Sequence, residues 1–329
     1  MVNNILIFRT DRIGDLLFTC PAIISIKKHL KNTKITLIAS DKNYHYAKSL
    51  KIFDDILIFP QSSLLKKIKL IHKLSKTYFN YVIAFDGKER SIISSVFSKS
   101  DCKIAVIPES KFTFFWNFFK IKFIKDNEKS NIIEIYQKVL DSCKINTSIN
   151  NFNFLNKKSD NNFSSKISAQ NYIHIHLDEK WINNLYIKDY TDINITYDNF
   201  IEFIKNISKD NRVLITSGMI DFNLLDNLKK NFTRQDDKIY YKNISNNPVY
   251  FIYKPTFEDI ESLLRKAKFL VSCHGAITHA ANSLGIKILD ILEENKSAWY
   301  QRFNLYLKNY KSIFRSDFNL LSKEIAKYL

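Results

Sequence analysis

The sequence has few glycines and cysteines, 5 and 4 respectively among 329 residues. The cysteines are scattered and form no Cys-x-x-Cys pair, which favours reduced thiols in a cytoplasmic protein. No apolar run is long enough to cross a membrane, so the sequence predicts no transmembrane helix. The N-terminus also lacks the basic region, apolar region and cleavage site that together make a secretory signal.

Acidic residues are scarce relative to basic ones, and the formal net charge is +17. Such an excess favours polyanionic partners: nucleic acid, an anionic membrane surface or phosphorylated substrates. The charge alone does not choose among them. The length favours two domains, and a hydrophobic content of 45% is enough to bury sizeable cores.

Apolar runs of strand length alternate with amphipathic segments in both halves of the chain, which predicts parallel sheets built from βαβ units. Strands are expected at residues 4–8, 35–39, 56–59, 81–85 and 103–107, and again at 172–176, 212–216, 249–252, 269–272 and 287–291. Helices are expected at residues 21–30, 64–74, 90–97 and 131–143, and again at 197–207, 221–232, 257–268 and 277–284.

A segment rich in Asn, Lys and Ser separates the two halves and is interpreted as a linker. The sequence therefore predicts an α/β protein with two Rossmann-like domains whose parallel sheets face a cleft. The expected boundaries are 1–155 for the first domain, 156–170 for the linker, 171–316 for the second domain and 317–329 for a closing helix.

A polar turn at residues 9–15 follows the first strand and contains two carboxylates and a glycine. Ligands of open α/β sheets bind at the carboxyl ends of the strands, where this turn lies. Gly14 suggests a backbone position with positive φ or with close approach of a ligand. The turn is therefore predicted to face a ligand, and the next helix is expected to begin at Pro21.

A second strand–turn–helix pattern covers residues 271–285. Gly275 would let the backbone approach a ligand, and the amides and dipole of the following helix would favour an anion. Thr278 and His279 could add side-chain donors, so a phosphate or diphosphate is the expected guest. An ordinary strand-to-helix turn with a polar helix start remains the alternative.

Other polar residues follow predicted strands and allow two interpretations each. Lys180 could reach a phosphate or remain a solvated loop residue. Asp221, close to Gly218, could accept hydrogen bonds from a ribose or cap the next helix. Two histidines alternate on one strand and face the same side, and with two more they could form the metal site of a hydrolase: His174, His176, His274 and His279.

The segment from Lys111 to Phe123 is dense in aromatic residues and bounded by lysines. This composition suits an anionic membrane interface, although base stacking or burial in a core would also explain it. We expect membrane contact here and no nucleic-acid partner.

Residues 9–15, together with Thr19 and Pro21, resemble the N-terminal signature of glycosyltransferase family 9, the ADP-heptose:lipopolysaccharide heptosyltransferases and their relatives. Residues 272–285 resemble the nucleotide-sugar motif of that family, with Gly275 and His279 at matching positions. The resemblance implies a GT-B fold with the donor nucleotide mainly on the second domain and the acceptor mainly on the first.

The resemblance further implies an inverting transfer of a sugar, heptose by family default, from an ADP-linked or other nucleotide sugar to a lipopolysaccharide-core or related acceptor. Asp15 would be the general base, and no metal or other cofactor would be needed. The implied donor-phosphate residues are Lys180, Gly275, Ala276, Thr278 and His279, and the implied nucleoside residues are Gly218 and Asp221. The implied acceptor-side residues are Arg9, Thr10, Asp11, Arg12 and Gly14.

The chain departs from the family pattern on the donor side. Cys273 and His274 replace an acidic residue and a Ser or Thr, and residues 177–179 replace a Pro-Gly element before the lysine. These departures leave the donor open and admit a catalytically inactive relative as an alternative. A phosphorylated, lipid-linked saccharide acceptor would place the protein in the cytoplasm, peripherally at the inner face of the cytoplasmic membrane.

Overall fold

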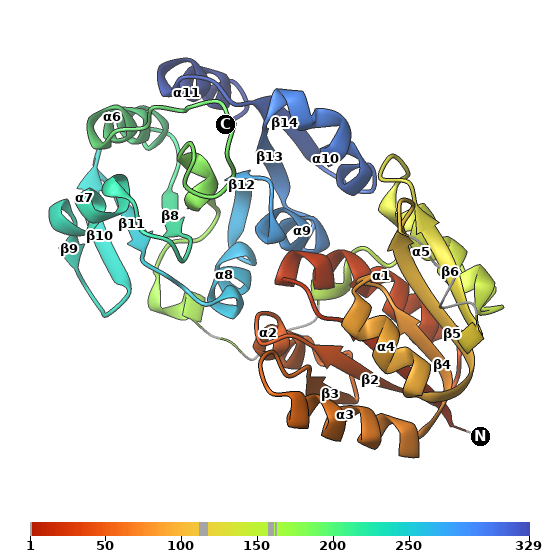
Figure 1. Cartoon of the computed structure of the whole chain (residues 1–329). Helices are drawn as coiled ribbons and strands as arrows, with labels where there is room; N and C mark the ends of the chain where they lie inside the picture. Colours follow the sequence, from red (N-terminus) through yellow and green to blue (C-terminus); the bar gives the residue numbers. More distant parts are fainter. Residues whose placement is uncertain (1, 112–117, 157–160, 162) are drawn as a thin grey trace. The chain divides into compact units, whose positions relative to one another are not determined.

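The computed structural model describes residues 2–111, 118–156, 161 and 163–329 (Figure 1). The chain forms two compact units, the first from residues 1–154 and 301–306 and the second from residues 155–300 and 307–329. Residues 301–306 thus belong to the first unit, whereas the sequence analysis assigned them to the second domain. No helix among the described residues is long and apolar enough to cross a membrane.

Six parallel strands form the sheet of the first unit, in the order β3-β2-β1-β4-β5-β6. The strands are β1 (Asn3–Arg9), β2 (Thr33–Ala39), β3 (Asp55–Ile58), β4 (Tyr78–Ala84), β5 (Lys99–Pro108) and β6 (Ile121–Asp126). The helices are α1 (Ile13–His29), α2 (Tyr44–Ser49), α3 (Leu64–Lys76), α4 (Glu89–Phe97) and α5 (Ile132–Ser142).

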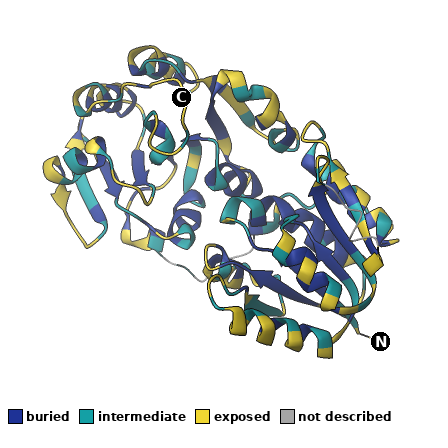
Figure 2. Ribbon diagram, viewed as in Figure 1, coloured by how far each residue is buried: buried dark blue, intermediate teal, exposed yellow. Residues whose placement is uncertain are grey.

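The strand order of this sheet reverses at the β1–β4 pair. Ligands of such folds bind at this point, outside the carboxyl ends of the strands. Ile5 to Phe8 of β1 have no exposed surface, as expected for a central strand of a parallel sheet covered on both faces. Figure 2 shows the buried strands in dark blue beneath helices whose outer faces are yellow.

The start of α1 corrects the sequence analysis. The helix begins at Ile13 rather than at Pro21, which lies inside it. Gly14 is part of the first helical turn and does not have positive φ, so the first of the two reasons expected for this glycine was wrong and close approach of a ligand stays a prediction. Strand β6 and helix α2 were not predicted.

Eight strands form the sheet of the second unit, in the order β14-β13-β12-β7-β8-β11-β10-β9. The strands are β7 (Tyr172–Leu177), β8 (Val213–Ser217), β9 (Thr233–Arg234), β10 (Ile239–Ile244), β11 (Asn247–Ile252), β12 (Ala267–Cys273), β13 (Lys287–Leu292) and β14 (Tyr310–Phe314). The parallel arrangement is confirmed except at β10, which pairs antiparallel with both β11 and β9.

The helices of the second unit are α6 (Tyr197–Ile207), α7 (Asn223–Asn231), α8 (Phe257–Leu264), α9 (Ala276–Ser283) and α11 (Phe318–Ala326). Helix α10 (Ser297–Asn304) begins in this unit and ends in the first. The C-terminal helix, α11, packs into the second core, where the ring of Phe318 lies 6.2 Å from that of Phe200 and 5.8 Å from that of Phe203. Helix α8 ends earlier than expected because β12 already begins at Ala267.

Candidate functional site

A pocket of about 520 Å³ lies in the first unit, where the ends of β1 and β2 and the start of α1 meet. It gathers four of the residues that the sequence analysis selected, among them Asp15, with cationic and polar residues that it did not select. The lining residues are Thr10, Asp11, Arg12, Asp15, Ser40, Asp41, Lys42, Gln61, Lys88 and Arg90.

Asp15 is the third residue of α1, which places its carboxylate at the positive end of the helix. One carboxylate oxygen accepts a hydrogen bond from the backbone N–H of Arg12 at 3.1 Å. The other oxygen lies 3.6 Å from the Arg9 guanidinium. The side chain is 36% exposed, so it is held by two partners and is still open to the pocket.

Arg9 is buried, and its guanidinium contacts the polar turn from the interior of the first unit. Its Nε donates to the carbonyl oxygen of Asp15 at 3.0 Å, and its Nη1 donates to that of Phe85 at 2.7 Å. The guanidinium also lies 3.4 Å from the Asp11 carboxylate and 5.0 Å from the ring centre of Phe18. Arg9 therefore orients both carboxylates of the turn from inside the protein.

Asp86 and Arg90 were missed by the sequence analysis and hold Thr10. Asp86 accepts from the backbone N–H of Thr10 at 3.0 Å and from its hydroxyl at 2.6 Å. Arg90 donates to the carbonyl oxygen of Thr10 at 2.8 Å. Both residues follow β4 as the turn follows β1, so a carboxylate just beyond the predicted strand at residues 81–85 was the available signal.

Asp11 differs from Asp15 in its surroundings. Burial raises the pKa of Asp11 above its ordinary value, and this effect outweighs the opposing influence of Arg9 and Lys88. The Lys88 ammonium forms an ion pair with Asp11 and donates to the carbonyl oxygen of Thr10 at 3.3 Å. Asp11 thus orders the loop, whereas Asp15 presents the more exposed carboxylate.

A second cluster lies in the second unit, where β7, β8 and β12 end. Lys180 follows β7 in a short 3₁₀ helix (Glu179–Trp181), and its Nζ lies 2.5 Å from the Asp178 carboxylate. The same Nζ donates to the carbonyl oxygen of His274 at 2.7 Å. Burial alone would lower the pKa of Lys180, but the Asp178 carboxylate outweighs burial and the pKa is raised. The side chain is 14% exposed and paired with Asp178, so it is not a solvated loop lysine.

Gly275 allows this ammonium to approach the start of α9. A Cβ atom at Gly275 would lie 2.7 Å from Lys180 Nζ, closer than side chains pack. The backbone of Gly275 is extended, so the glycine is needed for space rather than for an unusual φ. The lysine charge is thereby placed beside the N-terminal turn of α9, which adds to the positive potential there.

Thr278 supports this turn from within. Its hydroxyl accepts from the backbone N–H of Gly275 at 3.2 Å and lies 3.3 Å from Asp290. The other oxygen of Asp290 lies 2.6 Å from His274 Nδ1 and 3.0 Å from the Tyr310 hydroxyl. Thr278 and Asp290 are fully buried, so they brace the turn instead of facing a ligand. Asp290 was missed, although a carboxylate within an apolar strand was a signal for it.

The four histidines do not form the alternative metal site. His174 Nε2 and His176 Nδ1 both lie 2.8 Å from the Thr216 hydroxyl, which confirms that they face the same side. His279 instead stands edge-on to His274, with ring centres 5.3 Å apart. Within the part of the chain that the structure describes, no three His, Cys, Asp or Glu residues are placed to share a metal ion.

Asp221 and Gly218 lie beyond β8, and Asp221 is not the helix cap that we considered. Phe222 occupies the cap position of α7. The Asp221 carboxylate instead accepts from the Tyr253 hydroxyl at 2.8 Å and from Lys254 Nζ at 2.6 Å. The bond from Lys254 is the main reason that the pKa of Asp221 is lowered. Gly218 packs closely, since a Cβ there would lie 3.0 Å from Asp178.

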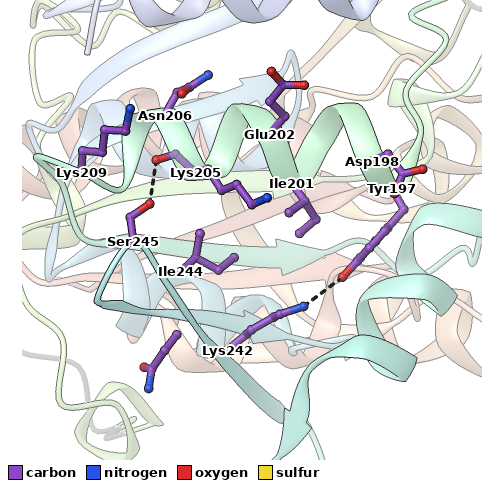
Figure 3. A pocket seen from close by; sticks show the side chains of 11 residues that line it. Tyr197, Asp198, Ile201, Glu202, Lys205, Asn206, Lys209, Lys242, Ile244 and Ser245 are labelled. Atoms are coloured by element: carbon purple, nitrogen blue, oxygen red, sulfur yellow. Dashed lines mark hydrogen bonds between the residues drawn. The ribbon is translucent and has the colours of Figure 1, made fainter.

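A pocket of the second unit, about 810 Å³ in volume, lies between α6 and the β10–β11 turn (Figure 3). Lys242 Nζ lies 3.4 Å from the Tyr197 hydroxyl, and the Ser245 hydroxyl donates to the carbonyl oxygen of Lys205 at 3.1 Å. Its lining includes none of the residues selected from the sequence. Residues 112–117 of the expected membrane segment lie outside the described residues, and its last three residues belong to β6.

Comparisons with known proteins identify the fold through solved structures and not through sequence. No protein-family model and no curated protein matches the sequence. A glycosyltransferase family 9 protein from Veillonella parvula superposes with a TM-score of 0.68 at 12% identity, covering 99% of this chain and 89% of that one.

The E. coli heptosyltransferase WaaC with ADP also has a TM-score of 0.68, at 14% identity, and covers 99% of this chain and 100% of that one. A UDP-GlcNAc 2-epimerase from Methanocaldococcus jannaschii has a TM-score of 0.57 at 13% identity, with 99% and 91% covered. Over almost its whole length, therefore, the chain has the GT-B fold of the family 9 heptosyltransferases, as the sequence predicted.

Proposed function

We propose that this chain is an inverting glycosyltransferase of the family 9 type, with Asp15 as its general base. The observation that carries the proposal is the placement of Asp15. Its carboxylate stands at the start of α1, held by Arg9 and Arg12, over a pocket lined by cations at the ligand-binding edge of the sheet. The likeness to family 9 structures supports the glycosyl-transfer role.

In the proposed reaction, Asp15 takes the proton from an acceptor hydroxyl while that oxygen attacks the anomeric carbon of the donor sugar. The bond between the sugar and the nucleoside diphosphate breaks in the same step, and the leaving group keeps the electron pair. Attack from the opposite face inverts the configuration. The alignment of Asp15 by Arg9 and Arg12 serves this step because a base must be held within hydrogen-bond reach of its proton.

The leaving diphosphate would bind at the start of α9, beside Ala276 and His279. Lys180 supplies positive charge there without a metal ion, and the helix dipole adds to it. Gly275 makes room, whereas Thr278 acts indirectly through the turn. The nucleoside would lie toward Gly218 and Asp221, and ADP is the first nucleotide to test because the WaaC neighbour holds it.

The acceptor would bind in the Asp15 pocket. Four of the residues that line this pocket are cationic: Arg12, Lys42, Lys88 and Arg90. Guanidinium and ammonium groups suit a phosphorylated saccharide. We therefore propose a phosphorylated, lipid-linked acceptor of the lipopolysaccharide-core type, with heptose as the first sugar to test, and a location at the cytoplasmic face of a membrane.

Replacing Asp15 by Asn tests the proposal. Asn keeps the shape and can still accept the Arg12 hydrogen bond, but it cannot take a proton. Transfer from ADP-heptose to a phosphorylated acceptor should fall by about 10²–10⁴-fold, while the rise in melting temperature caused by ADP stays as in the unchanged protein. Asp41→Asn is the matched control, because Asp41 lines the same pocket and should be dispensable for proton transfer.

Lys180→Ala completes the test on the donor side. The ADP-induced rise in melting temperature should largely disappear, because stabilisation by a ligand follows its affinity. Near-normal turnover of the Asp15→Asn variant would overturn the assigned base. No turnover and no nucleotide-induced shift in the unchanged protein would favour the inactive relative.

A further inference from the structure

Helix α3 of the first unit exposes an unusual amount of apolar surface. Leu64 and Leu65 are 70% and 72% exposed, and Ile68 is 53% exposed. The helix is anchored through its opposite side by the buried Leu70 and Leu74. Residues three and four positions apart lie on one helix face, so Leu64, Leu65 and Ile68 form a continuous apolar stripe toward solvent. Figure 2 shows the outer face of this helix in yellow.

Lysines border the apolar stripe. Lys69 and Lys73 are one helical turn apart and flank it, and α3 as a whole has five lysines and no acidic residue. Among the residues that the structure describes, no carboxylate forms an ion pair with any of these lysines. Lys66 and Lys67 lie in the first turn, where the helix dipole disfavours positive charge. Helix stability therefore does not explain Lys66 and Lys67, whereas Lys73 and Lys76 lie in the last turn, where the dipole favours positive charge.

We propose that α3 is a membrane-docking helix that lies along the surface of an anionic lipid bilayer. Leu64, Leu65 and Ile68 would enter the boundary between headgroups and acyl chains, and the lysines would contact lipid phosphates. A helix with one apolar and one basic face binds membranes in this way. The charge complementarity selects anionic lipid over neutral lipid, because each lysine near such a surface adds to binding.

The position of α3 gives the membrane contact a consequence for the acceptor. Gln61 lines the Asp15 pocket and hydrogen-bonds to Asp41 at 3.2 Å, and α3 begins three residues later. A bilayer held against α3 would therefore lie close to this pocket within the same unit. This consequence rests on the proposed function, since it requires that the acceptor binds there, whereas membrane docking itself does not.

Co-sedimentation of the full chain with lipid vesicles tests the proposal, with no nucleotide or acceptor present. The unchanged protein should bind phosphatidylcholine vesicles containing phosphatidylglycerol much more tightly than vesicles of phosphatidylcholine alone. Lys69→Gln with Lys73→Gln should weaken this binding by about 25-fold, about fivefold per lysine. Leu65→Gln with Ile68→Gln should weaken it by about tenfold, because the apolar face enters the bilayer.

Matched controls come from exposed positions of the second unit. Lys205→Gln with Lys209→Gln removes an equally spaced lysine pair, and Leu320→Gln removes a leucine that is 64% exposed on α11. Both should bind vesicles as the unchanged protein does. Asp15→Asn should also bind normally, so a failure of the proposed catalysis remains separate from a failure of docking.

Circular dichroism and urea unfolding should show that the α3 variants remain folded, because the changed positions are exposed. Equal vesicle binding by the unchanged protein and the α3 variants would overturn the proposal, and so would equal losses in the controls. The proposal would also be overturned if the unchanged protein did not bind vesicles and the α3 variants instead lost self-association or single-stranded nucleic-acid binding. That result would assign this face to another partner.

Discussion

Hydrogen bonds between buried side chains determine the protonation of single residues in this protein. Thr216 has one hydroxyl proton but lies 2.8 Å from a ring nitrogen of each of two histidines. It can therefore donate to at most one of the two rings, although its oxygen can accept from both. His174 Nδ1 is buried and has no hydrogen-bond partner among the described residues, which favours the neutral form of His174 with its proton on Nε2. The Thr216 hydroxyl is then available to donate to His176 Nδ1.

This arrangement predicts acid sensitivity of the second unit. Burial lowers the pKa of His176 from its ordinary 6.5 to about 4. Below pH 6.5 the unfolded chain therefore binds a proton at His176 more readily than the folded chain does. The contribution of neutral His176 to the free energy of unfolding is present above pH 6.5 and is lost as the pH falls toward 4. His176 should account for a loss of about 2 kcal/mol in the free energy of unfolding between pH 7 and pH 5.

Urea unfolding at the two pH values measures this loss. His176→Asn keeps a polar group near Thr216 but cannot take up the proton, so the loss should shrink by about 2 kcal/mol. His72→Asn is the control because His72 is exposed on α3, and it should leave the loss unchanged. Parallel pH profiles for the unchanged protein and His176→Asn would contradict the prediction.

Elements with strong periodicity could be predicted from the sequence, and those that depend on distant partners could not. Helix α6 was predicted with its correct bounds because apolar residues recur every three to four positions between clear polar flanks. The first helix was misjudged because Pro21 suggested a start, whereas Arg12 and Asp15 cap the helix nine residues earlier. Strand β9 has only two residues, too few for a pattern.

The candidate site was predictable to a similar extent. Asp15 and Lys180 lie six and three residues beyond the ends of β1 and β7, so local sequence was enough to select them. Asp290 and His274 are 16 residues apart and meet only because β12 and β13 are paired. No local pattern reports such a contact, so the sequence could not show that the turn before α9 is braced by a buried carboxylate.

Helix α8 offers a prediction at the scale of the element. Thr256 Oγ1 accepts from the backbone N–H of Asp259 at 3.2 Å, and the Asp259 carboxylate accepts from the backbone N–H of Thr256 at 3.0 Å. Thr256→Ala removes half of this reciprocal cap and should lower the free energy of unfolding by about 1 kcal/mol. Thr256→Ser keeps the hydroxyl and should recover most of the loss in urea unfolding. Equal losses in both variants would show that the methyl group, not the cap, matters.

At the scale of the whole molecule, the first unit is completed by residues far along the chain. Arg302 Nη2 lies 2.5 Å from the Asp126 carboxylate at the end of β6, and the ring of Phe303 lies 5.3 Å from that of Phe18. The sequence analysis placed residues 301–306 in the second domain because they follow its last predicted strand without a break in composition. Membership of a unit depends on these contacts, not on sequence order.

Removing the Arg302 charge should therefore destabilise the first unit. Arg302→Met leaves the Asp126 carboxylate without its partner in a mostly buried place, and the free energy of unfolding should fall by about 2 kcal/mol. Asp126→Asn in the same chain removes the unpaired charge and should restore part of the loss. Urea unfolding of the single and double variants measures both effects, and strictly additive losses would rule out the pairing as their cause.

The path of the chain determines what proteolysis and recombination can do to the two units. The chain passes between the units after residues 154, 300 and 306, so neither unit is one continuous stretch. A protease that cuts once near residue 160 would leave residues 301–306 attached to the second unit, so the first unit would consist of parts of two separate fragments. Asp126 and Arg302 form one ion pair although they are 176 residues apart in the sequence. A recombination event at the same point would therefore bring these two partners from different ancestors. Exchange of a whole first unit between relatives would therefore need two segments to move together.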